Sequence, residues 1–364
     1  MWLVALLVGM LPWYATMAQN HLRVSEIGGF PQSEAGYAMG VSACFAGTIG
    51  NHIIMAGGCN FPDNSGVKRY YNGIYAACWQ ADTLQWRCIG TLPEPVAYGA
   101  TVDMGDSLLL IGGNNQEHSL RQVVSVKLDP RGNAIVMRLP SLPVTVDNGA
   151  AAYAKGHVFV FGGNQNGKPS KALWSLSCSR PTSQWKSRKA MPGKPRVQPV
   201  CVAHGQRLFA WGGFYAKGAK SKVATDGYAY DVKRNRWAQL ATPRDAAGES
   251  LTLSGATGAT NGAGLLLCLG GVNKTIFADA ISGKYQLVDQ ADYLKQPVAW
   301  YRFNATPLVF NAKTLRWQKP TTPDARLARA GAQLIGIAAN QFLYIGGELK
   351  PGVRTPQILR IELE

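Results

Sequence analysis

The 364-residue sequence has few charged residues, and acidic ones above all are scarce. Charged residues make up 16% of the chain, and 21 Asp and Glu stand against 37 Lys and Arg, a formal net charge of +16. No run of five or more Lys or Arg occurs, and clustered charge is what marks a nucleic-acid surface. We therefore expect no nucleic-acid partner. A solvated cationic surface is the favoured interpretation, and attraction of anionic small molecules by the field of the whole protein is the alternative.

Motifs for metals, redox centres and membrane spans are also missing. The sequence has no CxxC and no HExxH, and its five histidines are scattered. These absences argue against a zinc ribbon, a thioredoxin-like site and a zinc protease. No apolar segment is long enough to span a bilayer as a stable helix, so we expect no stable membrane insertion.

The cysteine count is odd. The seven are Cys44, Cys59, Cys78, Cys88, Cys178, Cys201 and Cys268, so at least one thiol stays unpaired. Cys78 and Cys88 lie ten residues apart across an expected hairpin and are a candidate disulfide in an oxidising compartment. Free buried thiols are the alternative for most of the seven.

The N-terminus has the pattern of an export signal. Residues 1–14 (MWLVALLVGMLPWY) are apolar, and Thr16-Met17-Ala18 has small residues where a signal peptidase needs them. This pattern predicts a signal peptide over residues 1–18 and a mature chain that starts at Gln19. No Lys or Arg precedes the apolar run, and a buried first strand is the alternative interpretation.

Glycine is abundant, and its pairs recur at long intervals. An apolar strand followed by Gly-Gly occurs six times, with the second glycine at Gly58, Gly113, Gly163, Gly213, Gly271 and Gly347. Four of the repeats continue with another strand, a turn and a tryptophan: Trp86, Trp185, Trp237 and Trp317. A period near 50 residues with this pattern is typical of kelch repeats. The fold class is therefore expected to be all-β, a six-bladed kelch-type β-propeller formed as a single domain by residues 19–364.

The ends of the chain predict how such a propeller closes. The last repeat has three strands before Glu364, and residues 21–28 (HLRVSEIG) resemble the missing fourth strand. We expect residues 21–28 to pair with residues 357–363 and to complete the last blade, which removes two open sheet edges.

The loops that follow each Gly-Gly and those that enter each first strand are expected to ring one mouth of the central channel, the default ligand site. Glu348 is the one carboxylate directly after a Gly-Gly, and Arg354 lies six residues further along the same loop. Together they would supply a general acid/base beside a guanidinium that fits a carboxylate, and they are the candidate catalytic residues. The candidate substrate-binding residues at the same mouth are Asn60, Tyr98, Arg196, Glu249, Asn273 and Arg329.

A long segment follows Gly271 and carries several aromatic residues, among them Tyr293, Trp300 and Tyr301. A lid over the mouth is one interpretation. A packed surface excursion is the other.

The loop GGELKPGVRT at 346–355 resembles that of the N-acetylneuraminate epimerases, or sialic acid mutarotases. Similar pieces are GGCNFPD at 57–63, GGVNKTIF at 270–277 and PRVQ at 195–198, and the likeness covers essentially the whole mature chain. The order of the loops resembles a cyclically permuted group within that family. The sequence departs from the family at Val96, where Arg is common, and at Glu249, where His is common.

The resemblance implies a periplasmic isomerase that interconverts the α and β anomers of N-acetylneuraminate, with Glu348 as acid/base and Arg354 on the sugar carboxylate. It implies an anionic sugar as the partner and neither a metal nor a redox cofactor. Monomer and homodimer both fit the sequence. A carbohydrate-binding propeller without chemistry is the main rival, since a fold alone does not give a function. A sialidase-like hydrolase and a copper oxidase are disfavoured because their motifs are missing.

Overall fold

The computed structural model describes residues 22–63, 65–80, 83–180 and 182–364. Within these ranges the chain is all-β and consists of many antiparallel sheets, as expected. The predicted signal peptide 1–18, the start at Gln19 and the first residue of the expected closing strand, His21, lie outside the described residues. None of the described helices is long and apolar enough to cross a membrane.

The larger sheets are meanders in which consecutive strands pair. In the first half of the chain they comprise β2 (Phe45–Ile49), β3 (His52–Ala56), β6 (Gly73–Cys78) and β7 (Arg87–Thr91); β8 (Ala100–Asp103), β9 (Leu108–Ile111), β10 (Val123–Leu128) and β11 (Ala134–Leu139); and β13 (Ala150–Ala154), β14 (His157–Phe161), β17 (Leu173–Ser177) and β18 (Lys186–Arg188). In the second half they comprise β19 (Val197–His204), β20 (Arg207–Tyr215), β22 (Gly227–Asp231) and β23 (Arg236–Leu240), with β21 (Lys222–Val223) on β20; β24 (Thr257–Thr260), β25 (Leu265–Leu269), β26 (Leu308–Asn311) and β27 (Arg316–Trp317); and β28 (Gln333–Ala338), β29 (Gln341–Ile345), β32 (Ile358–Leu363) and β1 (Leu22–Ile27).

Shorter elements decorate these sheets. The small hairpin strands are β4 (Cys59–Asn60) and β5 (Arg69–Tyr70); β12 (Val146–Asp147), β15 (Asn164–Gln165) and β16 (Lys168–Pro169); and β30 (Glu348–Lys350) and β31 (Val353–Arg354). The helices are α1 (Lys274–Ser282) and α2 (Gln290–Tyr293), and the 3-10 turns are η1 (Tyr37–Met39), η2 (Val298–Tyr301) and η3 (Ala325–Leu327).

The core lies between neighbouring sheets. The second strands are continuous apolar runs, and β9 (LLLI) is buried along its whole length, as expected for a strand with both faces covered. One core cluster joins Trp211 of β20 to Phe310 of β26, whose ring centroids lie 4.7 Å apart. Apolar side chains of adjacent sheets therefore hold the sheets together.

Three of the repeated tryptophans tie one repeat to the segment that ends the repeat before it. Each of these tryptophans is partly buried, and its indole N–H donates to a backbone carbonyl. The pairs are Trp185 to Pro140 (2.8 Å), Trp237 to Lys189 (2.7 Å) and Trp317 to Ala241 (2.9 Å). These three tryptophans therefore fasten junctions between sheets.

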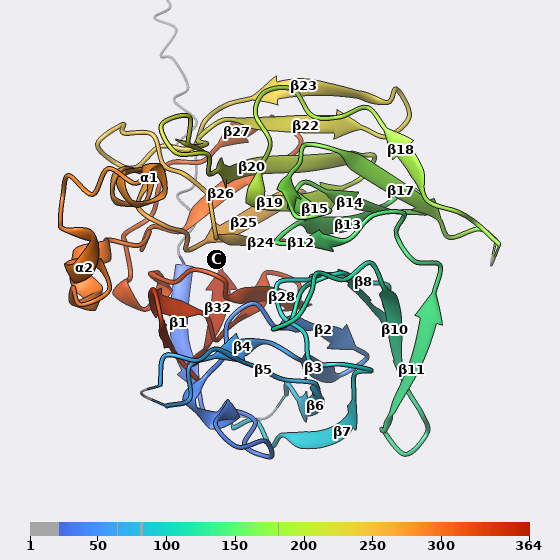
Figure 1. The fold of residues 1–364 in the computed structure, drawn as a ribbon. Coiled ribbons are helices and arrows are strands. Elements are labelled where there is room, and N and C mark those ends of the chain that lie inside the picture. The colour runs from blue at the N-terminus through green and yellow to red at the C-terminus, as the bar shows by residue number, and fades with distance from the viewer. Residues whose placement is uncertain (1–21, 64, 81–82, 181) are drawn as a thin grey trace, which may run out of the picture.

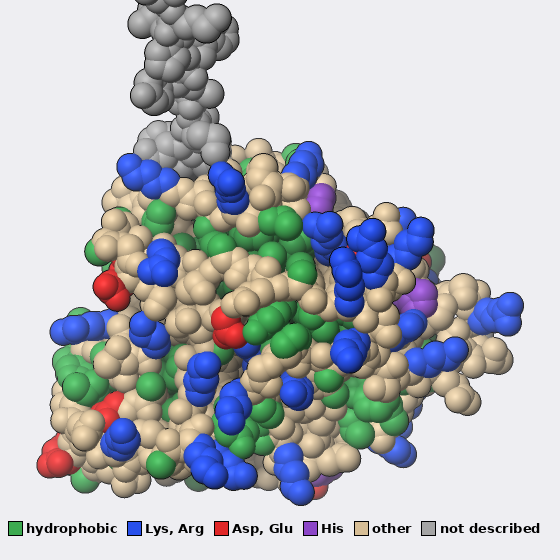
Figure 2. Space-filling view, turned by 90° about the horizontal axis from the view of Figure 1, so that it is seen from above, with side chains coloured by type: hydrophobic (Ala, Val, Ile, Leu, Met, Phe, Trp, Pro, Cys, Tyr) green, Lys and Arg blue, Asp and Glu red, His purple; other side chains and the backbone are tan. Residues whose placement is uncertain are grey.

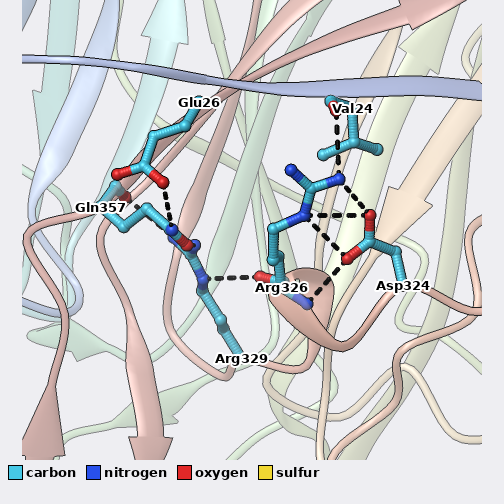
Figure 3. A network of polar contacts seen from close by, with 6 residues as sticks. All are labelled: Val24, Glu26, Asp324, Arg326, Arg329 and Gln357. Atoms are coloured by element: carbon cyan, nitrogen blue, oxygen red, sulfur yellow. Dashed lines mark hydrogen bonds and ion pairs between the residues drawn. The ribbon is translucent and has the colours of Figure 1, made fainter.

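The N-terminal strand completes the last sheet. β1 pairs antiparallel with β32, from Leu22 opposite Leu363 to Ile27 opposite Ile358, and Figure 1 shows the two strands side by side. This confirms the pairing predicted for the described part of residues 21–28. Side chains reinforce the joint: Gln357 Nε2 donates to Glu26 Oε2 (2.8 Å), and a guanidinium nitrogen of Arg326 donates to the carbonyl of Val24 (3.1 Å), as Figure 3 shows.

The first strands of the larger sheets contact one another in a closed cycle, in the order β2, β8, β13, β19, β24, β28 and back to β2. A ring of backbone hydrogen bonds runs just ahead of these strands. Each member donates its N–H to the carbonyl of the member before it, at 2.7–3.1 Å; the members are Ala43, Tyr98, Asn148, Gln198, Gly255 and Gly331, and Ala43 donates to Gly331. We call this set the hydrogen-bond ring.

All members of the hydrogen-bond ring have a positive φ, between 52° and 70°. This left-handed conformation is uncommon for a residue as bulky as Tyr98. It persists because hydrogen bonds on both sides fix each member.

Figure 2 shows one face of the molecule, where Lys and Arg side chains are spread widely and clearly outnumber Asp and Glu. This distribution agrees with a solvated cationic surface.

Candidate active site

The hydrogen-bond ring surrounds a cavity of about 240 Å³. Its wall is made by residues at the start of the first strands and by one side chain from a different element, Glu348 of β30. The three ring members on one side carry little or no side chain and the three on the other are polar: Gly255, Gly331 and Ala43 against Tyr98, Asn148 and Gln198. The wall of the cavity thus has small residues along one half of the ring and polar residues along the other half.

Glu348 and Arg354 face each other across the β30–β31 hairpin. The two residues are register partners, and Arg354 Nη1 lies 3.2 Å from Glu348 Oε1. The Glu348 side chain is 22% exposed and that of Arg354 only 4%. The hairpin is anchored to the ring, because Glu348 and Ala330 exchange backbone hydrogen bonds next to Gly331. The structure therefore brings the two predicted catalytic residues together at the cavity.

Burial raises the pKa of the Glu348 carboxyl above its usual value of 4.5. The charge of Arg354 and the N–H of Gly352, which donates to Oε1 at 3.1 Å, oppose that rise without cancelling it. A carboxyl with a raised pKa suits a group that must both take and return a proton.

Arg354 is held more by rings and charge than by hydrogen bonds. Its guanidinium lies 5.3 Å from the centre of the Phe61 ring, and its Nε has no hydrogen-bond partner among the described residues. A nearly buried guanidinium with unused donors, beside a carboxylate that lines the cavity, is suited to an anionic group of a ligand.

Tyr98 is the third predicted residue at this place. It lines the cavity, and its hydroxyl accepts a hydrogen bond from Lys68 Nζ at 3.2 Å. Burial raises the pKa of the phenol well above 10, and the neighbouring Cys59 and the charge of Glu348 raise it further. The charge of Arg354 lowers the pKa of the phenol. Tyr98 thus lies within electrostatic reach of both catalytic candidates.

Lys68 was not singled out from the sequence. Its ammonium lies 5.0–5.9 Å from the ring centres of Phe61, Tyr70 and Tyr98. Such cation–π contacts hold a cation in place when it is partly removed from water. Its charge lowers the pKa of Glu348, so it belongs to the same electrostatic cluster. The loop after Gly58 could have been flagged by its aromatic residues, but not the position of its lysine.

A chain of hydrogen-bonded polar side chains lies on the polar side of the ring. Buried Asp147 accepts hydrogen bonds from Ser119, Asn148 and Asn164, and Asn148 Oδ1 in turn accepts one from Gln198 Nε2 (2.8 Å). A carboxylate accepts only, so it fixes which end of each amide faces the next. The polar half of the ring is therefore preorganised.

The segment after Gly271 lies against the β30–β31 hairpin. Lys350 of β30 donates to the carbonyls of Leu294 (3.1 Å) and Gln296 (2.7 Å). Burial raises the pKa of Tyr301, and the charge of Glu348 raises it further. Figure 1 shows α1 and α2 of this segment on one side of the molecule. The segment therefore packs against the hairpin that carries Glu348 and Arg354, and none of its residues is among those that line the cavity.

The two other predicted arginines do not line the cavity. Arg196 is 3% exposed and donates to the carbonyls of Gly212 and Asp226 and to the Asp226 carboxylate. Arg329 is 1% exposed and donates to the carbonyls of Arg326, Gly346 and Gln357 and to the Gln357 side chain, part of which Figure 3 shows. Their guanidinium groups are committed to the backbone between sheets.

The remaining candidates are also used elsewhere. The buried Asn60 amide nitrogen donates to the carbonyls of Gly36 and Gly40, and its amide oxygen accepts a hydrogen bond from the Tyr71 hydroxyl. Asn273 caps α1. Glu249 is exposed on a turn and is not among the residues that line the cavity.

The seven cysteines are free thiols. Cys88 lies opposite Tyr75 and Cys78 opposite His52, so Cys78 and Cys88 are out of register on neighbouring strands and do not pair. In the part of the chain that the structure describes, no three or more His, Cys, Asp or Glu are grouped so as to hold a metal ion.

The geometry defines a class of protein: an all-β protein with a small cavity lined by a carboxylate and a phenol, with a guanidinium paired to that carboxylate. The family of N-acetylneuraminate epimerases matches residues 12–136 and 139–364. The chain therefore belongs to this family.

Individual relatives are similar over a shorter region. The chain is 30% identical over 234 residues to an N-acetylneuraminate epimerase of Yersinia enterocolitica, which is 61% of this chain and 56% of that protein. It is 30% identical over 251 residues to one of Salmonella paratyphi B (65% and 61%), and 30% identical over 232 residues to one of Haemophilus influenzae (60% and 57%). The matches thus span less than two thirds of the length of these relatives.

Proposed function

We propose that the protein is a mutarotase that interconverts the α and β anomers of N-acetylneuraminate. The observation that carries the proposal is the Glu348–Arg354 pair at the cavity, with its contact of 3.2 Å and a carboxyl whose pKa is raised. Membership of the family supports the choice of sugar. The formal net charge of +16 favours the approach of an anionic substrate.

In the proposed reaction the ionised Glu348 takes the proton of the anomeric hydroxyl while the ring oxygen is protonated. The ring opens to a ketone, the C1–C2 unit rotates, and the ring closes on the other face. Arg354 holds the C1 carboxylate with its unused donors. General acid–base assistance of about 10²–10⁴-fold is enough for a reaction that also runs unaided in water.

The fold proposed to carry this site is a single six-bladed kelch propeller over residues 19–364. The closed cycle of first strands, the hydrogen-bond ring and the β1–β32 pairing support it. We further propose that residues 1–18 are a signal peptide and that the protein works in the periplasm. Mass spectrometry of the protein from its host should find a start at or near Gln19; an intact Met1 in a cytosolic fraction would refute export.

The test of function is a proton NMR time course of α-N-acetylneuraminate freshly released by a sialidase, with and without the protein. We expect the α signals to convert to β faster with the protein. A carbohydrate-binding propeller without chemistry would bind the sugar and leave the rate of anomer exchange unchanged, and that result would overturn the proposal.

A further inference from the structure

Opening and closing a cyclic hemiketal moves protons at two oxygen atoms. The anomeric hydroxyl must lose a proton and the ring oxygen must gain one, and the reverse holds when the ring closes. Glu348 is the sole Asp or Glu that lines the cavity among the described residues. A single ionised carboxylate can take the first proton, but it has none to give to the second oxygen at the same moment.

Tyr98 has the position and the environment of a second proton-transfer group. Its side chain lines the same cavity as Glu348, and both Glu348 and Arg354 act on it electrostatically. Its hydroxyl oxygen accepts a hydrogen bond from Lys68 at 3.2 Å. The Lys68 ammonium thus donates to the oxygen that would carry negative charge after release of the proton, and the charge of Arg354 opposes the burial that raises the pKa of the phenol.

Three aromatic rings lie around the Lys68 ammonium. Its ammonium lies 5.0 Å from the centre of the Tyr98 ring, 5.8 Å from that of Phe61 and 5.9 Å from that of Tyr70. These aromatic rings thus favour a cation at the place where a phenolate would form.

We propose that Tyr98 is a catalytic residue that exchanges a proton with the ring oxygen of the sugar while Glu348 exchanges one with the anomeric oxygen, and that Lys68 is the positioning residue of Tyr98. This inference rests on the proposed mutarotase function and adds to it the second half of the proton transfer.

The proton balance closes without a co-reactant. On ring opening, Glu348 takes the anomeric hydroxyl proton, the bond between C2 and the ring oxygen breaks as the carbonyl forms, and the ring oxygen takes the Tyr98 proton. The resulting phenolate lies beside the cations Lys68 and Arg354. On closure the phenolate takes that proton back, the ring oxygen attacks the other face of the carbonyl, and Glu348 returns its proton to the carbonyl oxygen.

The test compares Tyr98→Phe with the parent protein in the NMR assay, and both must show the same thermal midpoint. We expect kcat for anomer exchange to fall by about 10²-fold or more, within the range for the loss of a general acid, while KM changes little. Tyr153→Phe is the matched control, because Tyr153 is 42% exposed on β13, and it should retain the parent rate.

A double variant tests whether Lys68 works through Tyr98. Lys68→Met should lower kcat, and Tyr98→Phe with Lys68→Met should be no slower than Tyr98→Phe alone. If the two losses multiply, Lys68 acts independently of Tyr98, and its assignment as a positioning residue is overturned.

The outcomes separate the two proposals. If the parent accelerates exchange and Tyr98→Phe keeps the parent kcat, or loses only affinity, the second proton-transfer group is wrong and the mutarotase stands. If the parent itself does not accelerate exchange, the mutarotase fails, and the role of Tyr98 fails with it.

Discussion

Arg196 and Arg329 make the same set of contacts in two different repeats. The Nη1 of each donates to the carbonyl of the first glycine of a Gly-Gly, Gly212 or Gly346, and to the carbonyl of the residue that precedes a third strand, Asp226 or Gln357. The Nη2 of each then bonds to the side chain of that same Asp or Gln. The pair is a repeated structural clamp.

The carbonyl of the first glycine of each Gly-Gly pair accepts a hydrogen bond from an arginine in these two repeats, and from other donors in other repeats. The carbonyl of Gly57 accepts a hydrogen bond from the Tyr37 hydroxyl (2.9 Å), and the carbonyl of Gly270 accepts one from the Asn304 amide nitrogen (3.3 Å). We therefore expect Arg329→Leu to destabilise the protein, because each buried carbonyl left without a donor costs about 1–3 kcal/mol. Denaturant unfolding should show a lower midpoint than that of the parent, while affinity for the sugar is unchanged.

Arg23→Leu, at a 71% exposed side chain, is the control and should unfold like the parent. A loss of sugar affinity without a loss of stability would contradict a structural role for Arg329.

Glu348 and Glu249 offer a matched pair of substitutions. Glu348→Gln keeps the shape and most hydrogen bonds but cannot transfer a proton, so we expect it to fold, to bind the sugar and to lose most of the acceleration of anomer exchange. Glu249→Gln should retain near-parent rates, because Glu249 is exposed on a turn and is not a lining residue. The NMR time course measures both. The opposite pattern would transfer the acid/base role to Glu249.

The activity should depend on pH through Glu348. A base must be ionised, so kcat/KM is expected to fall as the pH drops through the pKa of Glu348. Burial raises that pKa above 4.5, so the midpoint of this acid limb should lie above 4.5. Arg354 lowers the pKa of Glu348, so Arg354→Gln should shift the limb to higher pH and weaken sugar binding as well. Rates corrected for the uncatalysed reaction give the profile, and a limb that stays in place in Arg354→Gln would show that another group controls it.

Lys350 links the β30–β31 hairpin to the segment after Gly271. Lys350→Met removes the donor to the carbonyls of Leu294 and Gln296, and we expect that segment to open more often. Limited proteolysis should cut within residues 283–300 faster than in the parent, and KM should rise because the hairpin that carries Glu348 and Arg354 loses a support. Lys295→Met, at a 72% exposed surface pair with Asp292, is the control. Equal cleavage of the Lys350 variant and the parent would mean that packing alone holds the segment.

The Gly-Gly spacing and the tryptophans predicted the sheets because each recurs with a physical purpose. The pairing of residues 22–27 with the last strand followed from one missing strand. Glu348 was chosen as a candidate because a carboxylate stands where the other repeats have a cysteine, an amide or an apolar residue, and Arg354 because it lies in the same loop.

The direction of a side chain was harder to foresee. Arg196 and Arg329 precede first strands, as expected, but their side chains turn between sheets. A comparison among the repeats carried a signal, since the positions equivalent to Arg329 hold Val41, Val96, Val146 and Leu253, which are all buried. Lys68 could not have been placed, because only the folded loop brings it over Tyr98.

The bond from Ala43 to Gly331 joins residues that are 331 − 43 = 288 positions apart, and the β1–β32 pairing spans nearly the whole described chain. Contacts between such distant residues form slowly, because a long loop must close before they are gained. Lys68 and Tyr98 come from the early part of the chain and Glu348 and Arg354 from its end, so the site straddles this joint. A chain with all its hairpins formed would still be inactive until the joint closes, and the recovery of activity during refolding would time that last step.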